Sequence, residues 1–222
     1  MNVGFKPTEV IVPRTAVGTP VALAQRTNRV LRPRDAATVY AHPRAELARL
    51  IRTGAAIRLA NGYAALTPPA QLGDPAWLPE LNAAALAIAQ ADYGKDAVAL
   101  MGVSAARHHG AIPRAIAVAV VAVPKQRPPL HSEVGLVLFS RREFGNLDVE
   151  RIETGLGSGW VTTVEQTMLD LAHRPGLGGL APTEVDQAIR SLAARADRAL
   201  LADLATAQHR PTALRHIQAL EV

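Results

Sequence analysis

The sequence predicts an α+β fold with two domains: a small helical domain that ends in a β-hairpin, and a larger mixed α/β domain with a helical C-terminal tail. Helix signals and then a hairpin signal fill residues 1–66, and a Pro-rich segment covers residues 67–79. In residues 80–222, β-branched apolar runs alternate with amphipathic stretches. We expect the middle segment to be a linker with few contacts between the domains, so that each folds on its own.

Three helices are expected in the first domain. Residues 1–17 show no periodicity and predict an arm or a short strand. The pattern is helical over Thr19–Val30. A second short helix is expected over Arg32–Ala41, and it ends near His42-Pro43 because proline disfavours a helical conformation in the residue before it. A proline then opens a third helix over Pro43–Thr53, and Gly54 suits its C-terminal stop.

The third helix is amphipathic on a wheel of about 100° per residue. Its apolar stripe consists of Leu47, Leu50 and Ile51. Its arginines lie on the other side of the wheel: Arg44, Arg49 and Arg52. The helix therefore buries one face and presents a basic one.

A hairpin follows this helix directly, because AAIRLA and YAAL flank Asn61-Gly62, the strongest two-residue hairpin signal. Three helices and then a hairpin is the winged-helix order, typical of DNA-binding domains in which the third helix reads the major groove and the hairpin contacts phosphate or minor groove. Arginines just before the second helix and on the hairpin would contact phosphate. The expected DNA-binding residues are Arg32, Arg34, Arg44, Arg49, Arg52 and Arg58.

Charge is divided unevenly along the chain. Residues 1–66 hold 10 Lys/Arg against 3 Asp/Glu, whereas residues 67–222 hold 14 against 16. This asymmetry favours a nucleic-acid-facing module joined to a part with another role. Arg outnumbers Lys 21 to 3, which reflects a GC-rich genome as much as selection, so a solvated arginine-rich helix face is the alternative interpretation.

The composition narrows the class of protein. Apolar residues are 49% and charged residues 19%, a globular balance. No apolar run approaches the roughly 18 residues of a membrane span, and MNVGFKPTEVIVPR lacks the long apolar block of a secretory signal. Cysteine is absent, which excludes disulfides, thiolate metal sites and a Cys nucleophile. We therefore expect a cytoplasmic protein without membrane contact.

The second domain is expected to begin with an Ala-rich helix near Glu80–Tyr93 and another around Ala97–His109. The β-branched run Ala115–Pro124 predicts a buried strand, and VGLVLFS and VERIET predict two more. A capping box at Thr162 or Thr163 predicts a helix over TTVEQTMLDLAHRPG. The tail, residues 182–220, predicts two or three helices.

The motifs that resemble active sites are incomplete. GVSAA has Ala106 where a nucleophile elbow needs a second glycine, so Ser104 is expected to be a helix residue or cap. GLGSGW lacks both the G-x-G-x-x-G spacing and the Walker lysine, and predicts a turn between strand and helix. Asp170 is expected to cap a helix or pair with an arginine. We therefore expect a protein that is not an enzyme and has no catalytic residues.

His108 and His109 raise the question of a metal site. Adjacent helix residues project about 100° apart, so they do not converge as an i, i+4 pair does. No carboxylate lies at metal-ligand spacing beside them. A structural or surface role is favoured, and no metal and no cofactor are expected.

Three blocks, in this order, resemble AbiEi-family antitoxins. The first is ELARLIRTGAAIRLANGYAAL, with a basic helix and a wing that ends in Gly62-Tyr63. The second is LMGVSAARHHGAIPRAIAVAVVAVPKQR, similar to the family's SAAxxHG-then-Pro segment, and the third is VTTVEQTMLDLAHRPGLGG, similar to its threonine-threonine helix. Winged helices are common, so the ordered set carries the resemblance rather than any single block.

The resemblance implies an antitoxin of a type IV (AbiE-like) toxin–antitoxin system. In that family the winged helix binds repeats in the promoter of its own operon and represses it, and the C-terminal domain counters a nucleotidyltransferase-like toxin. Whether the toxin is bound directly or antagonised indirectly stays open. Two other functions remain: a ligand-responsive transcriptional regulator, and a nucleic-acid-processing enzyme.

Overall fold

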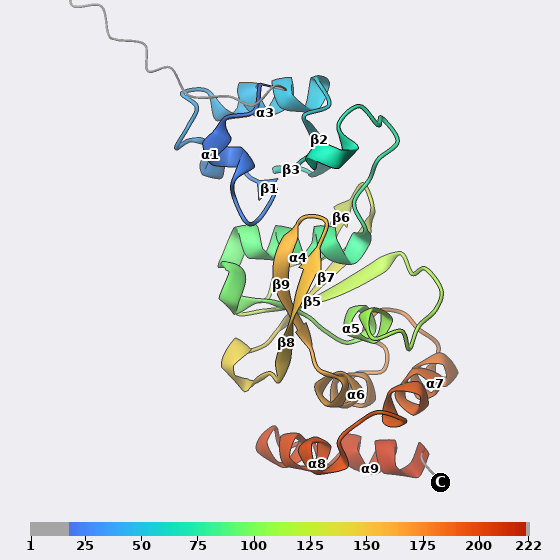
Figure 1. The fold of residues 1–222 in the computed structure, drawn as a ribbon. Coiled ribbons are helices and arrows are strands. Elements are labelled where there is room, and N and C mark those ends of the chain that lie inside the picture. Colours follow the sequence, from blue (N-terminus) through green and yellow to red (C-terminus); the bar gives the residue numbers. More distant parts are fainter. Residues whose placement is uncertain (1–17, 221–222) are drawn as a thin grey trace, which may run out of the picture.

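The computed structural model describes residues 18–220, and the expected arm over residues 1–17 lies outside them. Helices hold 43% and strands 21% of the chain, which confirms the predicted mixture of both. Two sheets organise the molecule (Figure 1): a three-stranded sheet in order β1-β3-β2, and a six-stranded mixed sheet in order β6-β7-β5-β4-β9-β8. We call residues 18–66 the head and residues 80–220 the body.

The head contains three helices and three strands. They are α1 (Val21–Ala24), β1 (Val30–Leu31), α2 (Pro33–Ala36), α3 (Pro43–Arg52), β2 (Ala56–Ala60) and β3 (Tyr63–Leu66). The body begins with a long helix and alternates strands and helices before its helical tail. Its elements are α4 (Leu81–Tyr93), β4 (Ala99–Leu100), α5 (Val103–His108), β5 (Val118–Val123), β6 (Leu130–Ser132), β7 (Gly135–Arg141), β8 (Val149–Thr154), β9 (Gly157–Thr162), α6 (Val164–His173), α7 (Pro182–Ala193), α8 (Arg198–Ala207) and α9 (Pro211–Leu220).

Local signals in the head are confirmed at α3 and at the hairpin, where Gly62 takes a φ of 84° in the β2–β3 turn. The helix expected over Thr19–Val30 is wrong, because α1 has four residues and Val30 lies in a strand. Val30 and Leu31 are fully buried and pair with β3, so pairing with a distant strand overrides helical periodicity. The second helix is likewise shorter than expected.

Two expectations for the body are also wrong. The helix expected over Ala97–His109 splits, because Ala99 and Leu100 form β4 between β5 and β9 and Gly102 precedes α5. GLGSGW is not a turn before a helix but enters strand β9. Gly157 has a φ of 129°, and a β carbon there would collide with the Thr27 carbonyl of the head. This glycine therefore permits close approach of the two parts.

The strand predicted from the β-branched run is buried on both faces, as a strand covered by helices on both sides must be. Its odd positions, such as Val121, join the core on the α4 side of the sheet, and its even positions, such as Val120, join the core with α5 and α6. The helix expected after Thr163 is confirmed as α6, with the Thr163 hydroxyl accepting from the Gln166 amide. The tail forms three helices, the last of which starts at Pro211.

Helix α4 lies between the head and the six-stranded sheet (Figure 1). All of residues 82–90 are buried, and Val30, Leu59 and Ala65 of the head pack into the same core as these residues. The expectation of few contacts between the two parts is therefore wrong. The boundaries of the two domains stay a prediction. Among the described residues, no helix is both long and apolar enough to cross a membrane.

Candidate functional site

A groove of about 250 Å³ runs between α3 and the β2–β3 hairpin. Helix α3 lines it with Arg44, Ala48 and Ile51, and the hairpin lines it with Arg58 and Asn61. Arg44 and Arg58 are both exposed, so two basic groups from different elements face one hollow. The sequence predicted both as DNA contacts without showing that they meet.

Two further predicted arginines are exposed on the same part of the head. Arg34 of α2 lines a neighbouring hollow together with Arg44, and Arg52 lies in the last turn of α3. The structure gives Arg34 and Arg52 no carboxylate partner among the described residues, so both guanidinium groups remain available to an anionic ligand.

Arg49 lies apart from these arginines. Its Nε donates to Glu46 at 2.9 Å and its Nη2 donates to the carbonyl of Gly18 at 3.3 Å. The hydrogen bond with Glu46 raises the pKa of Arg49. Arg49 therefore ties α3 to the chain that precedes α1.

Arg32 is mostly buried, with 13% of its side chain exposed. Its guanidinium donates to Asp35 at 2.9 Å and to Asp92 of α4 at 2.7 Å. Burial alone would lower the pKa of Arg32, but the hydrogen bonds with these two carboxylates outweigh it and raise the pKa. The bond with Asp35 is local to the start of α2, and the bond with Asp92 holds this start against the body.

Asp92 collects three partners, and we call Arg32, Tyr63, Asp92 and Arg127 the Asp92 cluster. The Tyr63 hydroxyl donates to the second Asp92 oxygen at 2.7 Å, and Arg127 donates to the same oxygen. Burial, followed by the hydrogen bond with Asp92, raises the pKa of Tyr63. Arg127 also lies over the Phe139 ring, 4.4 Å from its centroid. The cluster joins the head, α4 and the loop after β5.

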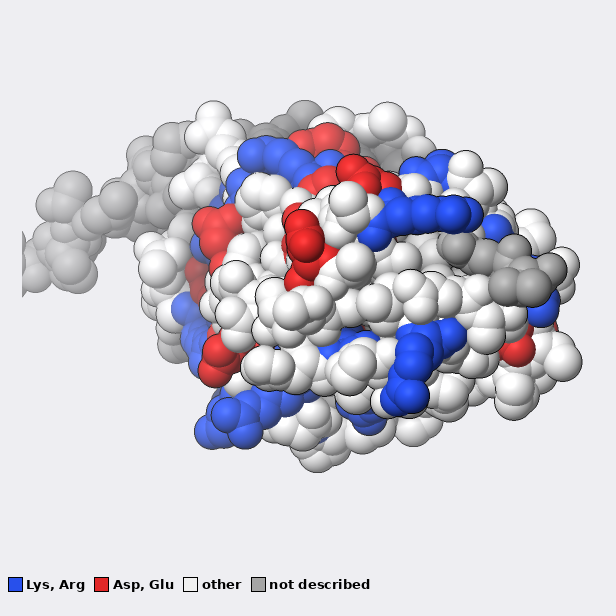
Figure 2. Space-filling view, turned by 90° about the horizontal axis from the view of Figure 1, so that it is seen from below, with Lys and Arg blue, Asp and Glu red and all other residues white. Residues whose placement is uncertain are grey.

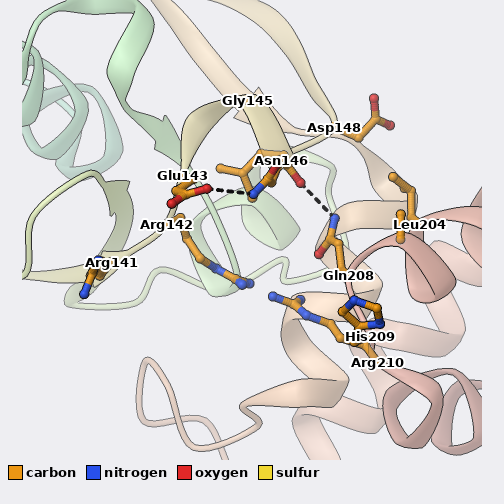
Figure 3. A pocket seen from close by; sticks show the side chains of 12 residues that line it. Arg141, Arg142, Glu143, Gly145, Asn146, Asp148, Leu204, Gln208, His209 and Arg210 are labelled. Carbon is orange, nitrogen blue, oxygen red and sulfur yellow. Dashed lines mark hydrogen bonds between the residues drawn. The ribbon is translucent and has the colours of Figure 1, made fainter.

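A second hollow, about 730 Å³ in volume, lies in the body between the loop after β7 and the connection from α8 to α9. In Figure 3, Arg142 and Arg210 point toward one another into it, whereas Arg141 points away. Asn146 bridges its rim through hydrogen bonds with Glu143 and Gln208.

Asp170 lies behind Arg142 and Arg210, and its side chain is fully buried. Its Oδ1 accepts from Arg142, from Arg210 at 2.8 Å and from Gln166 at 3.2 Å, so the expected pairing with arginine is confirmed. Its Oδ2 has no hydrogen-bond partner within residues 18–220. Complete burial raises the pKa of Asp170 to about 6, against the opposing effect of Arg142.

The structure also brings together groups that sequence spacing left apart. The donor atoms of His108, His109 and Glu150 all lie within 4.8 Å of one another. Glu150 belongs to β8, distant in sequence from the histidines of α5. Ser104, as expected, is a helix residue, and its hydroxyl accepts from the Val120 amide at 2.8 Å.

Figure 2 shows the face of the body on the side of α8 and α9. Basic and acidic side chains are interspersed there among uncharged ones. This mixture agrees with the near balance of charges in residues 67–222. The excess of positive charge lies instead in residues 1–66 of the sequence, which hold 10 Lys/Arg against 3 Asp/Glu.

Comparison with known protein families shows to which class of protein this chain belongs. The family model of the AbiEi antitoxin C-terminal domain matches residues 97–222, which contain the Arg142–Asp170–Arg210 site and the two histidines. The protein is an antitoxin by class, and the chain belongs to the AbiEi antitoxin family. The resemblance seen in the sequence is confirmed. A comparison with curated proteins finds no match.

The raised pKa of Asp170 has a consequence for stability. The folded protein holds a proton between about pH 4 and pH 6 that the unfolded chain has lost, so stability falls as pH rises through this window. The free energy of unfolding of the wild type, relative to Asp170→Asn, should fall there by up to about 3 kcal/mol. Urea unfolding across this pH range measures the difference, with Asp203→Asn, an exposed carboxylate of α8, as control. A difference that grows with pH contradicts the assignment.

Proposed function

We propose that this chain is the antitoxin of a type IV toxin–antitoxin system. Its head is a winged-helix domain that binds repeats in the promoter of its own operon and represses transcription. Its body, joined through residues 67–79, counters a cognate nucleotidyltransferase-like toxin. This function needs no catalytic step by the antitoxin. Membership of the AbiEi antitoxin family supports the second role.

One observation carries the DNA-binding role. Arg44 on α3 and Arg58 on the hairpin face the same groove, and Arg34 lines a neighbouring hollow together with Arg44. Arg52 is exposed in the last turn of α3. In a winged-helix domain the third helix lies in the major groove of the DNA, and the wing contacts phosphates beside that groove. Cationic side chains from both elements that face one hollow suit this mode of binding. We propose Arg44 and Arg52 for the major groove and Arg34 and Arg58 for phosphate.

Two predicted arginines have a different role in this proposal. Arg32 and Arg49 spend their hydrogen bonds on carboxylates and carbonyls of the protein. If either arginine turned to bind phosphate, its carboxylate partner would be left unpaired. The free energy lost in breaking that ion pair would offset most of what the phosphate contact contributes. We therefore assign them to positioning: Arg32 fixes α2 against the body, and Arg49 fixes α3.

A second candidate function is a regulator that responds to a small ligand, as the hollow at Arg142 and Arg210 is large enough for one. Such a regulator requires no toxin, whereas the antitoxin proposal does. Protection of cells from the product of a neighbouring toxin gene separates the two.

Replacing Arg44, Arg52 and Arg58 together by Ala in the full chain should abolish specific binding to the operon promoter. Each lost base contact costs about 1–3 kcal/mol, and each lost phosphate contact lowers the slope of log K against log salt by about 0.9. Mobility shifts at several salt concentrations measure both effects. The matched control removes the same charge from the body: Arg151, Arg190 and Arg215 to Ala. If both triple variants bind the promoter as the wild type does, the head is not the DNA interface.

The same Arg44/Arg52/Arg58 variant should still protect cells from the toxin when expressed from an unrelated promoter. The three side chains are exposed head residues, and the body that contains the antitoxin domain stays intact. The full chain is used because head and body share a core. Plating cells that express the toxin measures protection. Loss of protection by a variant that remains folded would show that countering the toxin depends on DNA binding.

A further inference from the structure

We propose that His108, His109 and Glu150 form a binding site for a divalent transition metal of the zinc class. The site lies where the C-terminus of α5 meets β8, an edge strand of the six-stranded sheet. It is remote from the groove of the head, and it does not depend on the proposed DNA binding or on the toxin.

The orientation of His109 favours metal binding. Its Nε2 lies 2.7 Å from the carbonyl oxygen of Thr162, so this nitrogen carries the hydrogen and donates it. The lone pair is then on Nδ1, which lies 3.8 Å from Oε1 of Glu150. Metal-binding histidines are commonly fixed in this way, with one ring nitrogen donating to a backbone carbonyl and the other facing the ion. The His109 side chain is only 8% exposed, so the ring is held in place.

His108 supplies the third donor. Side chains of adjacent helix residues project about 100° apart. The ring centroids of His108 and His109 nevertheless lie 5.3 Å apart, with an angle of 72° between the ring planes. The imidazole rings reach far enough to compensate for the diverging Cα–Cβ bonds, and Glu150 of β8 brings a carboxylate oxygen within 4.8 Å of a nitrogen of each ring. The spacing of two adjacent histidines carries no information about a ligand from a distant strand, which is what Glu150 supplies.

The three donors need only a small shift to close around an ion. Two ligands bonded to tetrahedral zinc at about 2.1 Å lie about 3.4 Å apart. The donor atoms here lie within 4.8 Å, and Glu150 is 51% exposed and free to move toward the histidines. Two imidazoles and one carboxylate suit zinc and its neighbours, whereas calcium and magnesium prefer oxygen alone. Three protein ligands leave a fourth position for water.

An ion at this place would tie the edge of the sheet to a helix. Within the part of the chain that the structure describes, strand β8 pairs only with β9, and its Glu150 lies opposite Val161. A metal ion that binds the folded chain but not the unfolded chain raises the unfolding temperature by mass action. The carbonyl that orients His109 belongs to Thr162, the last residue of β9, so both strands of this hairpin take part.

The test uses untagged full-length protein freed of metal and titrated with Co²⁺, followed by displacement with Zn²⁺. We expect visible d–d absorption that saturates at one ion per chain, and a higher unfolding temperature with Zn²⁺. His108→Ala and Glu150→Gln change exposed side chains, and each should weaken binding about tenfold or more. The matched controls are His173→Ala, which changes an exposed histidine of α6, and Glu153→Gln, which changes an exposed carboxylate of β8. Both controls should bind Co²⁺ as the wild type does.

Two results would overturn the proposal. One is a wild-type protein without d–d absorption and without a rise in unfolding temperature. The other is equal Co²⁺ affinity of the wild type, His108→Ala and Glu150→Gln, which would place the ion elsewhere. Circular dichroism of each variant separates loss of a ligand from loss of the fold.

Discussion

The position of the head on the body depends on the hydrogen bonds that the carboxylate of Asp92 accepts. This carboxylate accepts hydrogen bonds from Arg32 before α2, from Tyr63 of the hairpin and from Arg127 of the body. Since the three donors come from separate segments, one side chain fixes the head on α4. Arg32 and Arg127 offset the charge of Asp92, so its partial burial leaves no unpaired ion. Any ligand that turns the head relative to the body must disturb this cluster.

Much of the head was predictable because its signals are local. The proline and glycine that bound α3, its amphipathic stripe and Asn61-Gly62 all act within a few residues. The errors fall where partners are distant. Val30 is a strand residue because it pairs with Ala65, and GLGSGW enters strand β9, which pairs with the distant β4 through Val161 and Leu100. Periodicity within a window carries no information about such pairings.

The contact between head and body had a signal in the sequence. Residues 83–89 of α4 are all apolar and cover every side of the helix over about two turns, and such a stretch is stable only when it is covered all round. Its Ala-rich stretch therefore required a second layer beside the sheet, and the head supplies it through Leu59 and Ala65. The ion pair of Arg32 with Asp92 and the approach of Glu150 to the histidines had no such signal, since their partners lie far apart in sequence.

Hydrogen exchange of the full chain, with and without a duplex of the operon promoter, tests the central claim most directly. The proposed arrangement places the duplex against α3 and the β2–β3 hairpin, with the body behind α4. It predicts that DNA slows exchange in peptides that cover residues 43–66 and leaves β5 and α6–α9 unchanged. Slower exchange confined to residues 97–220, with the head unaffected, would contradict it.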